Sequence, residues 1–537
     1  MAPNGRNTIA FTEVDELNNP ASTLIYSELQ SGQSVKDGLR NEIRGRVDIA
    51  HVPGASTPWS MKSIQNLLAD VFLPAGYPHS VSEDYVPYQI FDSLQAFSSS
   101  IAGLLSSRAV LQGVGVGNAD ASPTSALLLH ILQDTSGRIA TILFAHRVGT
   151  ALEPECKMYR FAADIFNDLA MVLDCLSPMI PAGVSRVTVL SAAGVLRALC
   201  GVAGGSSKAS LSAHFAKWGN LAEVNAKDSS QETVISLVGM LVGSLVVSHI
   251  TSFTATWLTL LALLTLHLSL NYTAVRSVQM TTLNRQRANI VFSSMLSSDP
   301  DFALLASVQL ADQQNYAEPV ERNQEDLQIP SPAQVSRRER IFDASGTLKW
   351  YLHSLKEGEG ERHTMPEILG KCRIGVSPRE FLSSPSSIST SSGSLRTSIP
   401  IAALTSLFDD EDYILIFTPM ILGTNPKPTA KILLKQHATP KTHLKAWMHA
   451  LLAARLLTRS CSPSAQATQD GKKRDDESST ETGTVLSTLE RTLSFLNETS
   501  RFKRYIGALG DKGWEVDVEG GGVSALETRV GTRVVVS

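Results

Sequence analysis

The sequence predicts a mainly α-helical protein, in which a multi-span helical membrane domain is followed by a smaller soluble α+β domain. Two observations support this fold class. Between Glu232 and Arg276 the chain has 43 consecutive residues without Asp, Glu, Lys or Arg. Beyond about residue 290 the composition becomes polar, with Ser-rich and charged stretches between short apolar segments. Charged residues are only 18% of the 537 residues and the mean hydropathy is +0.02, so polar and apolar segments must be separated along the chain.

Composition also excludes several classes of protein. The formal net charge of -4 disfavours a protein that holds nucleic acid through bulk positive charge. The five cysteines include no Cys-x-x-Cys pair, which argues against a zinc module or a disulfide scaffold. The first thirty residues contain four acidic side chains and no apolar run typical of a signal peptide. We therefore expect the chain to enter a membrane through internal segments.

We divide the chain into four regions by composition. A peripheral or partly ordered segment covers residues 1–62, the helical membrane domain 63–290, a polar linker 291–340 and the α+β domain 341–537, which has low-complexity inserts near 383–398 and 460–483. Apolar periodicity in the last region predicts strands and helices. The strands are expected at Tyr413–Phe417, Lys431–Lys435, Trp514–Val518 and Thr532–Val536, and the helices at Pro440–Leu457 and Val485–Leu496.

The long uncharged tract determines the prediction for the membrane domain. A helix needs about 20 apolar residues to span a bilayer, so the tract accommodates two spans joined by a tight turn near His249–Ser252. The alternative is a pair of buried helices in a large soluble domain. Gly239 and Gly243 have the Gly-x-x-x-Gly spacing that permits close helix approach. With the other apolar blocks, we expect four to six hydrophobic helices. Basic residues on both flanks of the tract predict that both of its ends face the cytosol.

Carboxylates interrupt one of the apolar blocks at helical spacing. Asp164 and Asp168 lie one turn apart on one stripe of the amphipathic segment Phe161–Ile180. Inside a membrane domain such side chains are expected to face a polar interior, with Lys208, Lys227 or Arg197 as partners. The alternative is an interfacial helix whose polar stripe meets water or lipid headgroups.

A glycine- and serine-rich stretch precedes Lys208. It lacks the glycine before the lysine and the Ser or Thr after it that a Walker A loop requires. The stretch favours a tightly packed turn between two helices. The ligand hypothesis is that Ser206, Ser207 and Lys208 begin a helix whose backbone N–H groups bind an anion.

Alternating charges stand immediately before the uncharged tract, at Lys227, Asp228 and Glu232. We predict that this segment caps the first span, and the alternative is that these side chains bind a ligand. The histidines have no metal-binding spacing, and the chain has no Gly-x-Ser-x-Gly elbow. We therefore expect neither catalytic residues nor a metal site.

Short segments spread in order over residues 64 to 290 resemble the root UVB-sensitive family, whose members share a domain of unknown molecular function. Leu433–Lys435 and His443–Ala450 in the smaller domain are also similar to that family. The first set of segments is Pro74–Val81, Asp84–Gln89, Phe91–Phe97, Gly113–Asn118, Phe161–Met171, Val202–Gly205, Asn225–Thr233, Asn271–Arg276 and Thr282–Asn284.

The resemblance implies an integral membrane protein that acts in vitamin B6 homeostasis, and plant members of the family work with one another. It therefore implies membrane lipid, paralogous family members or a second copy of the chain as partners. Nucleic acid is not expected. A vitamin B6 form is the expected ligand, and we consider pyridoxal phosphate near Ser206, Ser207 and Lys208.

Three functional hypotheses follow. The first is a membrane protein that binds or transports a small metabolite through a polar site formed by Asp164, Asp168, Lys208 and the Lys227–Glu232 segment. The second is a membrane-anchored scaffold without a ligand site, whose soluble domain recruits partners. An enzyme that uses Lys208 or Lys227 as a Schiff-base amine is the least favoured class, because nothing in the sequence indicates a lowered lysine pKa.

Overall fold

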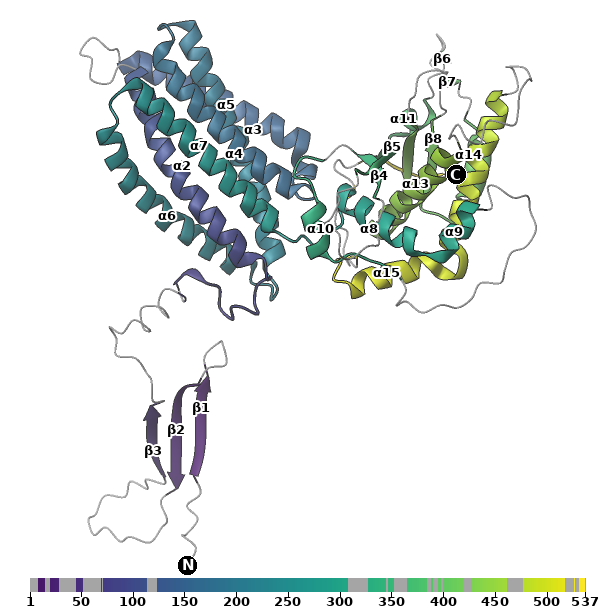
Figure 1. Cartoon of the computed structure of the whole chain (residues 1–537), viewed down its shortest axis with the longest axis horizontal. Helices are drawn as coiled ribbons and strands as arrows, with labels where there is room; N and C mark the ends of the chain where they lie inside the picture. Colours follow the sequence, from purple (N-terminus) through teal and green to yellow (C-terminus); the bar gives the residue numbers. More distant parts are fainter. Residues whose placement is uncertain are drawn as a thin grey trace, which may run out of the picture.

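The computed structural model describes residues 8–14, 20–28, 45–51, 69, 71–113, 123–307, 327–343, 346–351, 365–383, 388–389, 395–396, 399–418, 427–460, 477–516, 526 and 531–536. These residues form an N-terminal sheet, a bundle of long helices and a C-terminal domain in which helices surround a sheet (Figure 1). The predicted mainly α-helical fold with a smaller α+β part is confirmed.

The N-terminal sheet has three antiparallel strands in the order β1-β2-β3. The strands are β1 (Thr8–Val14), β2 (Pro20–Glu28) and β3 (Gly45–His51). The sequence predicts a peripheral or partly ordered segment here.

Six long helices form the bundle within the described residues. Three of them, α5, α6 and α7, are long and apolar enough to cross a membrane. The six helices are α2 (Tyr85–Gly113), α3 (Pro123–Val148), α4 (Cys156–Leu176), α5 (Val184–Phe215), α6 (Leu221–His249) and α7 (Phe253–Ser277).

Helix α2 occupies a central position in the bundle. It packs against α4, α6 and α7, whereas α5 packs against α3 and α4 (Figure 1). The chain reverses between α6 and α7 at the predicted place, because α6 ends at His249 and Ser252 caps α7 by accepting a hydrogen bond from the backbone of Ala255 at 3.2 Å. The two helices of the uncharged tract therefore both use α2 as a packing partner.

Gly239 and Gly243 explain how closely α6 approaches α2. A Cβ atom at Gly239 would lie 2.8 Å from the Cβ of Ser100 and 3.1 Å from the carbonyl oxygen of Phe97. A Cβ atom at Gly243 would lie 3.2 Å from the Cα of Ile101. Both glycines are buried, so the Gly-x-x-x-Gly spacing marks a helix–helix contact within this chain.

The C-terminal domain is built on a sheet of order β10-β9-β5-β4, with β8 paired antiparallel to β9. Helix α13 packs against this sheet. The strands are β4 (Thr347–Trp350), β5 (Glu367–Ile374), β8 (Tyr413–Phe417), β9 (Thr429–Lys435) and β10 (Arg533–Val534), with a separate pair β6 (Ile388–Ser389) and β7 (Leu395–Arg396). The helices are α8 (Arg285–Ser298), α9 (Pro300–Ser307), α10 (Pro332–Arg338), α11 (Pro378–Leu382), α12 (Ile401–Leu407), α13 (Pro440–Ser460), α14 (Glu477–Asn497) and α15 (Arg501–Asp511).

The core of this domain includes residues that were predicted to belong to the polar linker 291–340. Phe292 and Met295 of α8 and Val335 of α10 are buried in the same cluster as Trp447 of α13. The described parts of the predicted linker 291–340 are therefore not a linker, since their apolar side chains complete the core. The predicted domain boundary at residue 290 passes through α8.

Smaller differences concern the end of the chain. The described part of the predicted strand Trp514–Val518 makes only an isolated bridge, between Glu515 and Thr282. Helix α14 begins at Glu477 and so includes the end of the insert predicted at 460–483, while residues 461–476 lie outside the described residues. Most of the insert near 383–398 lies outside them as well.

Candidate functional site

Helix α4 carries a stripe of charged residues that faces the bundle interior. Arg160, Asp164 and Asp168 follow one another at four-residue spacing and are 6%, 7% and 4% exposed. The low exposure excludes the interfacial alternative, in which this stripe would meet water or headgroups. The predicted polar interior is therefore present, but most of the side chains that contact these carboxylates differ from the predicted partners.

Arg160 is the basic partner of the first part of the stripe. Its guanidinium lies 2.6 Å from Asp92 of α2 and 3.0 Å from Asp164, and its Nε donates to the hydroxyl of Tyr88 at 3.2 Å. The predicted partners were Lys208, Lys227 and Arg197. Arg160 was not among them, although it precedes Asp164 by one helical turn. The pairing joins α2 to α4.

Helix α7 contributes two polar residues to the same cluster. Nδ1 of His267 lies 2.8 Å from Oδ1 of Asp168, and Nε2 of His267 lies 3.6 Å from Oδ2 of Asp164. Asn271, one turn further along α7, donates a hydrogen bond from Nδ2 to Asp164. We call Asp92, Arg160, Asp164, Asp168, His267 and Asn271 the acidic cluster. His267 and Asn271 stand in the uncharged tract, and their four-residue spacing is the local signal that places them on one face of a helix.

Lys208 belongs to a neighbouring group of charges. Its ammonium lies 2.8 Å from Asp228 and 2.6 Å from Glu232, both on α6. The side-chain amide of Gln89 on α2 donates to the other oxygen of Asp228 at 3.0 Å. Because Gln89 and Asp92 lie within one turn of α2, this group adjoins the acidic cluster. The fold thus brings together five of the predicted residues: Asp164, Asp168, Lys208, Asp228 and Glu232.

The predicted anion site at Ser206, Ser207 and Lys208 is wrong in its geometry. These residues lie inside α5, which continues to Phe215, and not at a helix start. Ser207 is buried and its hydroxyl donates to the carbonyl oxygen of Ala203 at 2.6 Å. Backbone N–H groups in the middle of a helix are already bonded to the preceding turn, so they cannot hold an anion. The favoured interpretation, a packed turn between two helices, is also wrong, because α5 continues through this stretch.

The predicted cap at the start of the uncharged tract is also wrong. Helix α6 begins at Leu221, so Lys227, Asp228 and Glu232 lie within the helix and Asn220 is at its N-cap position. Asp228 is buried against Lys208. Lys227, the neighbouring residue in the sequence, projects from the helix roughly 100° away from Asp228.

A further buried carboxylate extends the polar stripe along α4. Asp174 accepts a hydrogen bond from Ser106 of α2 at 2.9 Å and pairs with Arg197 of α5. From Arg160 to Asp174 the helix rises about 21 Å at 1.5 Å per residue. We call the acidic cluster, the Lys208 group and the Asp174–Arg197 pair together the polar column, which follows α4 over most of its length.

His267 lies between two carboxylates of α4. Both ring nitrogens of His267 face carboxylates, and a neutral imidazole can donate to only one of them. An imidazolium or a protonated carboxyl would satisfy the second. Within the described residues, no three His, Cys, Asp or Glu side chains come close enough together to hold a metal ion.

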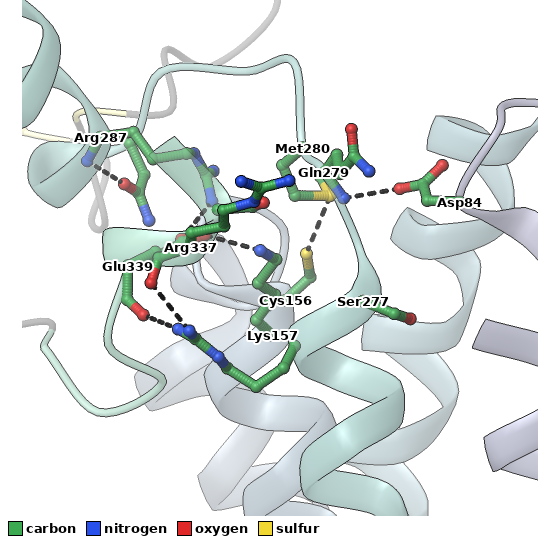
Figure 2. A network of polar contacts seen from close by, with 12 residues as sticks. Asp84, Cys156, Lys157, Ser277, Gln279, Met280, Arg287, Arg337 and Glu339 are labelled. Atoms are coloured by element: carbon green, nitrogen blue, oxygen red, sulfur yellow. Dashed lines mark hydrogen bonds and ion pairs between the residues drawn. The ribbon is translucent and has the colours of Figure 1, made fainter. Parts of the chain in front are cut away.

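A second polar network joins the bundle to the C-terminal domain around Glu339. The carboxylate of Glu339 lies 2.6 Å from Nζ of Lys157 on α4 and 2.7 Å from Nη1 of Arg287 on α8 (Figure 2). Arg276, at the end of α7, donates to the backbone carbonyl of Glu339. Burial alone would raise the pKa of Glu339, but the charges of Lys157 and Arg287 more than offset burial and hold it below its ordinary value.

Two further contacts lie at the same end of the bundle. Oδ2 of Asp84 accepts a hydrogen bond from the backbone N–H of Gln279 at 2.6 Å (Figure 2). The same oxygen lies 3.0 Å from Nε2 of His214. Glu155, which precedes α4, is buried, and its Oε2 accepts a hydrogen bond from Asn284 at 3.1 Å. Burial raises the pKa of Glu155 to about 7, against the opposing effect of Arg287.

Two family models match the chain, and both describe the same family. The model described as the vitamin B6 photo-protection and homoeostasis domain matches residues 58–299, which include the whole bundle. The model described as the C-terminal region of root UVB sensitive protein matches residues 414–519. The first match contains every residue of the polar column.

Individual relatives agree with the family models. The chain is 41% identical over 281 residues to RUS family member 1 of Dictyostelium discoideum, covering 52% of this chain and 48% of the relative. It is 37% identical over 229 residues to protein root UVB sensitive 3 of Arabidopsis thaliana, covering 42% of this chain and 51% of the relative. The matched part of the chain thus spans about half the length of these relatives. No solved structure matches the chain. The two family models and these identities show that the chain belongs to the root UVB-sensitive family.

Proposed function

We propose that this chain is an integral membrane protein whose helical bundle binds a small polar solute and carries it across the membrane, as part of vitamin B6 homeostasis. The observation that carries the proposal is the polar column, because five of its carboxylates, Asp92, Asp164, Asp168, Asp174 and Asp228, are buried in a bundle that contains three helices long and apolar enough to cross a membrane.

The outer surface of the bundle supports the membrane assignment. Leu237, Leu241 and Leu245 recur along α6 and are 53%, 61% and 64% exposed. On α7, Leu258 and Leu261 are 66% and 50% exposed. Continuous apolar faces of this kind are unfavourable in water and favourable against lipid tails. Basic residues near the start of α6 and the end of α7 support an orientation with both of these ends in the cytosol.

The interior supports a solute-binding function. Ionisable side chains within a bilayer are costly and are retained mainly where they face an internal pathway or bind a ligand. The polar column has six carboxylates, on three helices, and only three permanently positive partners, Arg160, Arg197 and Lys208. Packing between helices does not require an excess of buried carboxylates, so we infer that these side chains bind a solute.

The link with vitamin B6 comes from the family. The domain that matches residues 58–299 is named for vitamin B6 photo-protection and homoeostasis. Because the chain spans about half the length of its relatives, the metabolite is part of our proposal rather than a property transferred from them.

Quantification of vitamin B6 forms in a deletion strain tests the proposal. We expect the strain to have an altered vitamer profile that the wild-type chain corrects and the Asp164→Asn/Asp168→Asn variant does not. Asp134→Asn is the control, because Asp134 is exposed on α3 and outside the column. Immunoblots must show equal abundance of the variants. An unchanged profile in the deletion strain, or full correction by the double variant, would contradict the proposal.

Extraction of membranes with alkaline carbonate tests the membrane assignment separately. An integral protein stays in the pellet, whereas release of the intact chain into the supernatant would rule out a bilayer around α5, α6 and α7.

A membrane-anchored scaffold is the second candidate function. The contacts of Glu339 with Lys157 and Arg287 favour it, because they fix the C-terminal domain on the bundle as a platform for partners such as paralogous family members or a second copy. Affinity purification distinguishes the two candidates. If the chain is a scaffold, variants whose C-terminal domain no longer binds partners fail to correct the deletion strain. The Asp164→Asn/Asp168→Asn variant still corrects it.

A further inference from the structure

We propose that the solute bound by the polar column is a small organic cation with N–H donors, such as a primary ammonium, and that Asp168, Asn271 and Gln95 supply the oxygens that accept them. This inference rests on the proposed function, because it names the chemistry of the ligand for the same interior.

The charge of the acidic cluster gives the first argument. Asp92 and Asp164 share the guanidinium of Arg160, and the partner of Asp168 within the cluster is the imidazole of His267. Three carboxylates thus face one permanent positive charge, and protonation of His267 still leaves the cluster negative. Excess charge in a buried site is unfavourable, so a bound cation would stabilise it.

Unpaired oxygen atoms give the second, independent argument. Asn271 is fully buried, and its Oδ1 has no hydrogen-bond partner while its Nδ2 is bonded to Asp164. Oδ2 of Asp168 also lacks a partner, although its Oδ1 is held by His267. Gln95 is 4% exposed and donates from Nε2 to Asp92 at 3.3 Å, which leaves its Oε1 unpaired.

These three atoms have a common chemical character. Each is an acceptor, and each belongs to a side chain whose other polar atom is bonded to a member of the acidic cluster. A buried acceptor without a donor is destabilising by roughly 1–3 kcal/mol. The cluster therefore lacks N–H or O–H donors, and a ligand that carries both donors and positive charge satisfies both deficits.

The same geometry disfavours the two other obvious ligand classes. A metal ion needs several ligands at 2–2.6 Å, and the described residues bring no three suitable His, Cys, Asp or Glu side chains together. A phosphate needs uncompensated positive charge, whereas the ammonium of Lys208 is already held between Asp228 and Glu232.

Binding of matched vitamin B6 forms to the full-length chain in lipid nanodiscs tests the inference. Pyridoxamine carries an aminomethyl group where pyridoxine carries a hydroxymethyl group. The difference between their affinities therefore reports the contribution of the ammonium. By equilibrium dialysis we expect pyridoxamine to bind at least about tenfold more tightly than pyridoxine. The reason is that its ammonium forms a charge-assisted hydrogen bond in a buried site, which is stronger than the bond formed by a hydroxyl. Pyridoxal 5′-phosphate is the anionic probe and is expected to bind more weakly than both.

Variants connect the preference with the named oxygens. Asp168→Asn and Asn271→Leu should each weaken pyridoxamine binding at least about tenfold and change pyridoxine binding by less than about twofold. Gln95→Leu replaces Asn271→Leu if that variant fails to fold. Asp134→Asn, at an exposed position of α3, should leave all three affinities unchanged.

The outcomes separate this inference from the proposed function. If pyridoxine or pyridoxal 5′-phosphate binds more tightly than pyridoxamine, and the Asp168→Asn variant weakens that binding, the cation class is wrong and the binding function stands. If a folded chain binds none of the three probes, both are wrong.

Discussion

Nδ1 of His267 on α7 lies 2.8 Å from Oδ1 of Asp168 on α4, although the two residues are 99 positions apart in the chain. Both side chains are buried. The contact links the second helix of the uncharged tract to the charged stripe of α4. It therefore combines two features that are unremarkable separately, a histidine in an apolar helix and a carboxylate on an amphipathic one.

Replacement of His267 should destabilise the bundle. His267→Leu leaves Oδ1 of Asp168 without a donor, so we expect the free energy of unfolding in detergent to fall by roughly 1–3 kcal/mol. Adding Asp168→Leu should then cost less than it does in the wild type, because the two residues are coupled. His249→Leu, at the exposed end of α6, is the control. Equal stability of the two histidine variants would show that the contact does not stabilise the fold.

Gly239→Ala should separate α6 from α2. The new Cβ atom would lie 2.8 Å from Ser100 and 3.1 Å from the backbone oxygen of Phe97, so one helix must move. Overpacking of this kind costs roughly 1–3 kcal/mol, which exceeds the gain in helix propensity. Gly201→Ala is the matched control, because nothing lies within 4 Å of a Cβ atom there. We expect a lower melting temperature for Gly239→Ala only, and a melting temperature equal to that of Gly201→Ala would refute the close contact.

Glu339→Gln should loosen the C-terminal domain from the bundle. The substitution leaves the buried charges of Lys157 and Arg287 without their carboxylate, which costs roughly 3–5 kcal/mol. Limited proteolysis should then cut between the two parts more rapidly. Glu380→Gln removes the exposed pair with Arg373 and should cost less than about 1 kcal/mol. Similar proteolysis of both variants would mean that Glu339 does not hold the parts together.

Acid should weaken the same junction. Because the pKa of Glu339 is lower in the folded chain than its ordinary value of 4.5, its stabilising effect is complete above pH 4.5 and is lost as the pH falls through the lowered pKa. Proteolysis of the wild type at decreasing pH should therefore approach the rate of Glu339→Gln, and a constant difference between the two would contradict this.

Glu155 should give the opposite pH dependence. Burial raises the pKa of Glu155 from 4.5 to about 7, so the folded chain favours its protonated form. The stability from this group is complete below pH 4.5 and declines as the pH rises to about 7. Glu155→Gln resembles the protonated form and should be more stable than the wild type by roughly 3 kcal/mol at pH 8, with little difference at pH 4. Melting curves that keep the same pH dependence in both proteins would contradict this.

The elements predicted best were those with a strong pattern in the local sequence. The uncharged tract predicted two long helices and the turn at His249–Ser252, because its length matches two membrane-spanning helices joined by a short turn. The strand Tyr413–Phe417 and the helix from Pro440 were predicted for the same reason. The spacing of Asp164 and Asp168 placed both on one stripe of a helix, and only their burial showed that this stripe faces the interior.

The errors arose where glycine and charge were read as local signals. Gly201 to Lys208 suggested a helix start, yet α5 passes through this stretch without a break. Lys227 to Glu232 suggested a cap, yet Asp228 and Glu232 contact Lys208 from within α6. In both cases packing between helices outweighed the local preference of the residues.

The sequence by itself determined which segments are apolar enough to span a membrane and which helix face carries carboxylates, because both properties depend on residues close together in the chain. Only the tertiary structure decided the partners, since Arg160 meets Asp92 and His267 meets Asp168 across different helices. The order in which helices pack depends on many weak contacts between distant segments, and no spacing in one segment encodes it. For that reason the charge balance and the unpaired oxygens of the interior became visible only once α2, α4 and α7 were placed side by side.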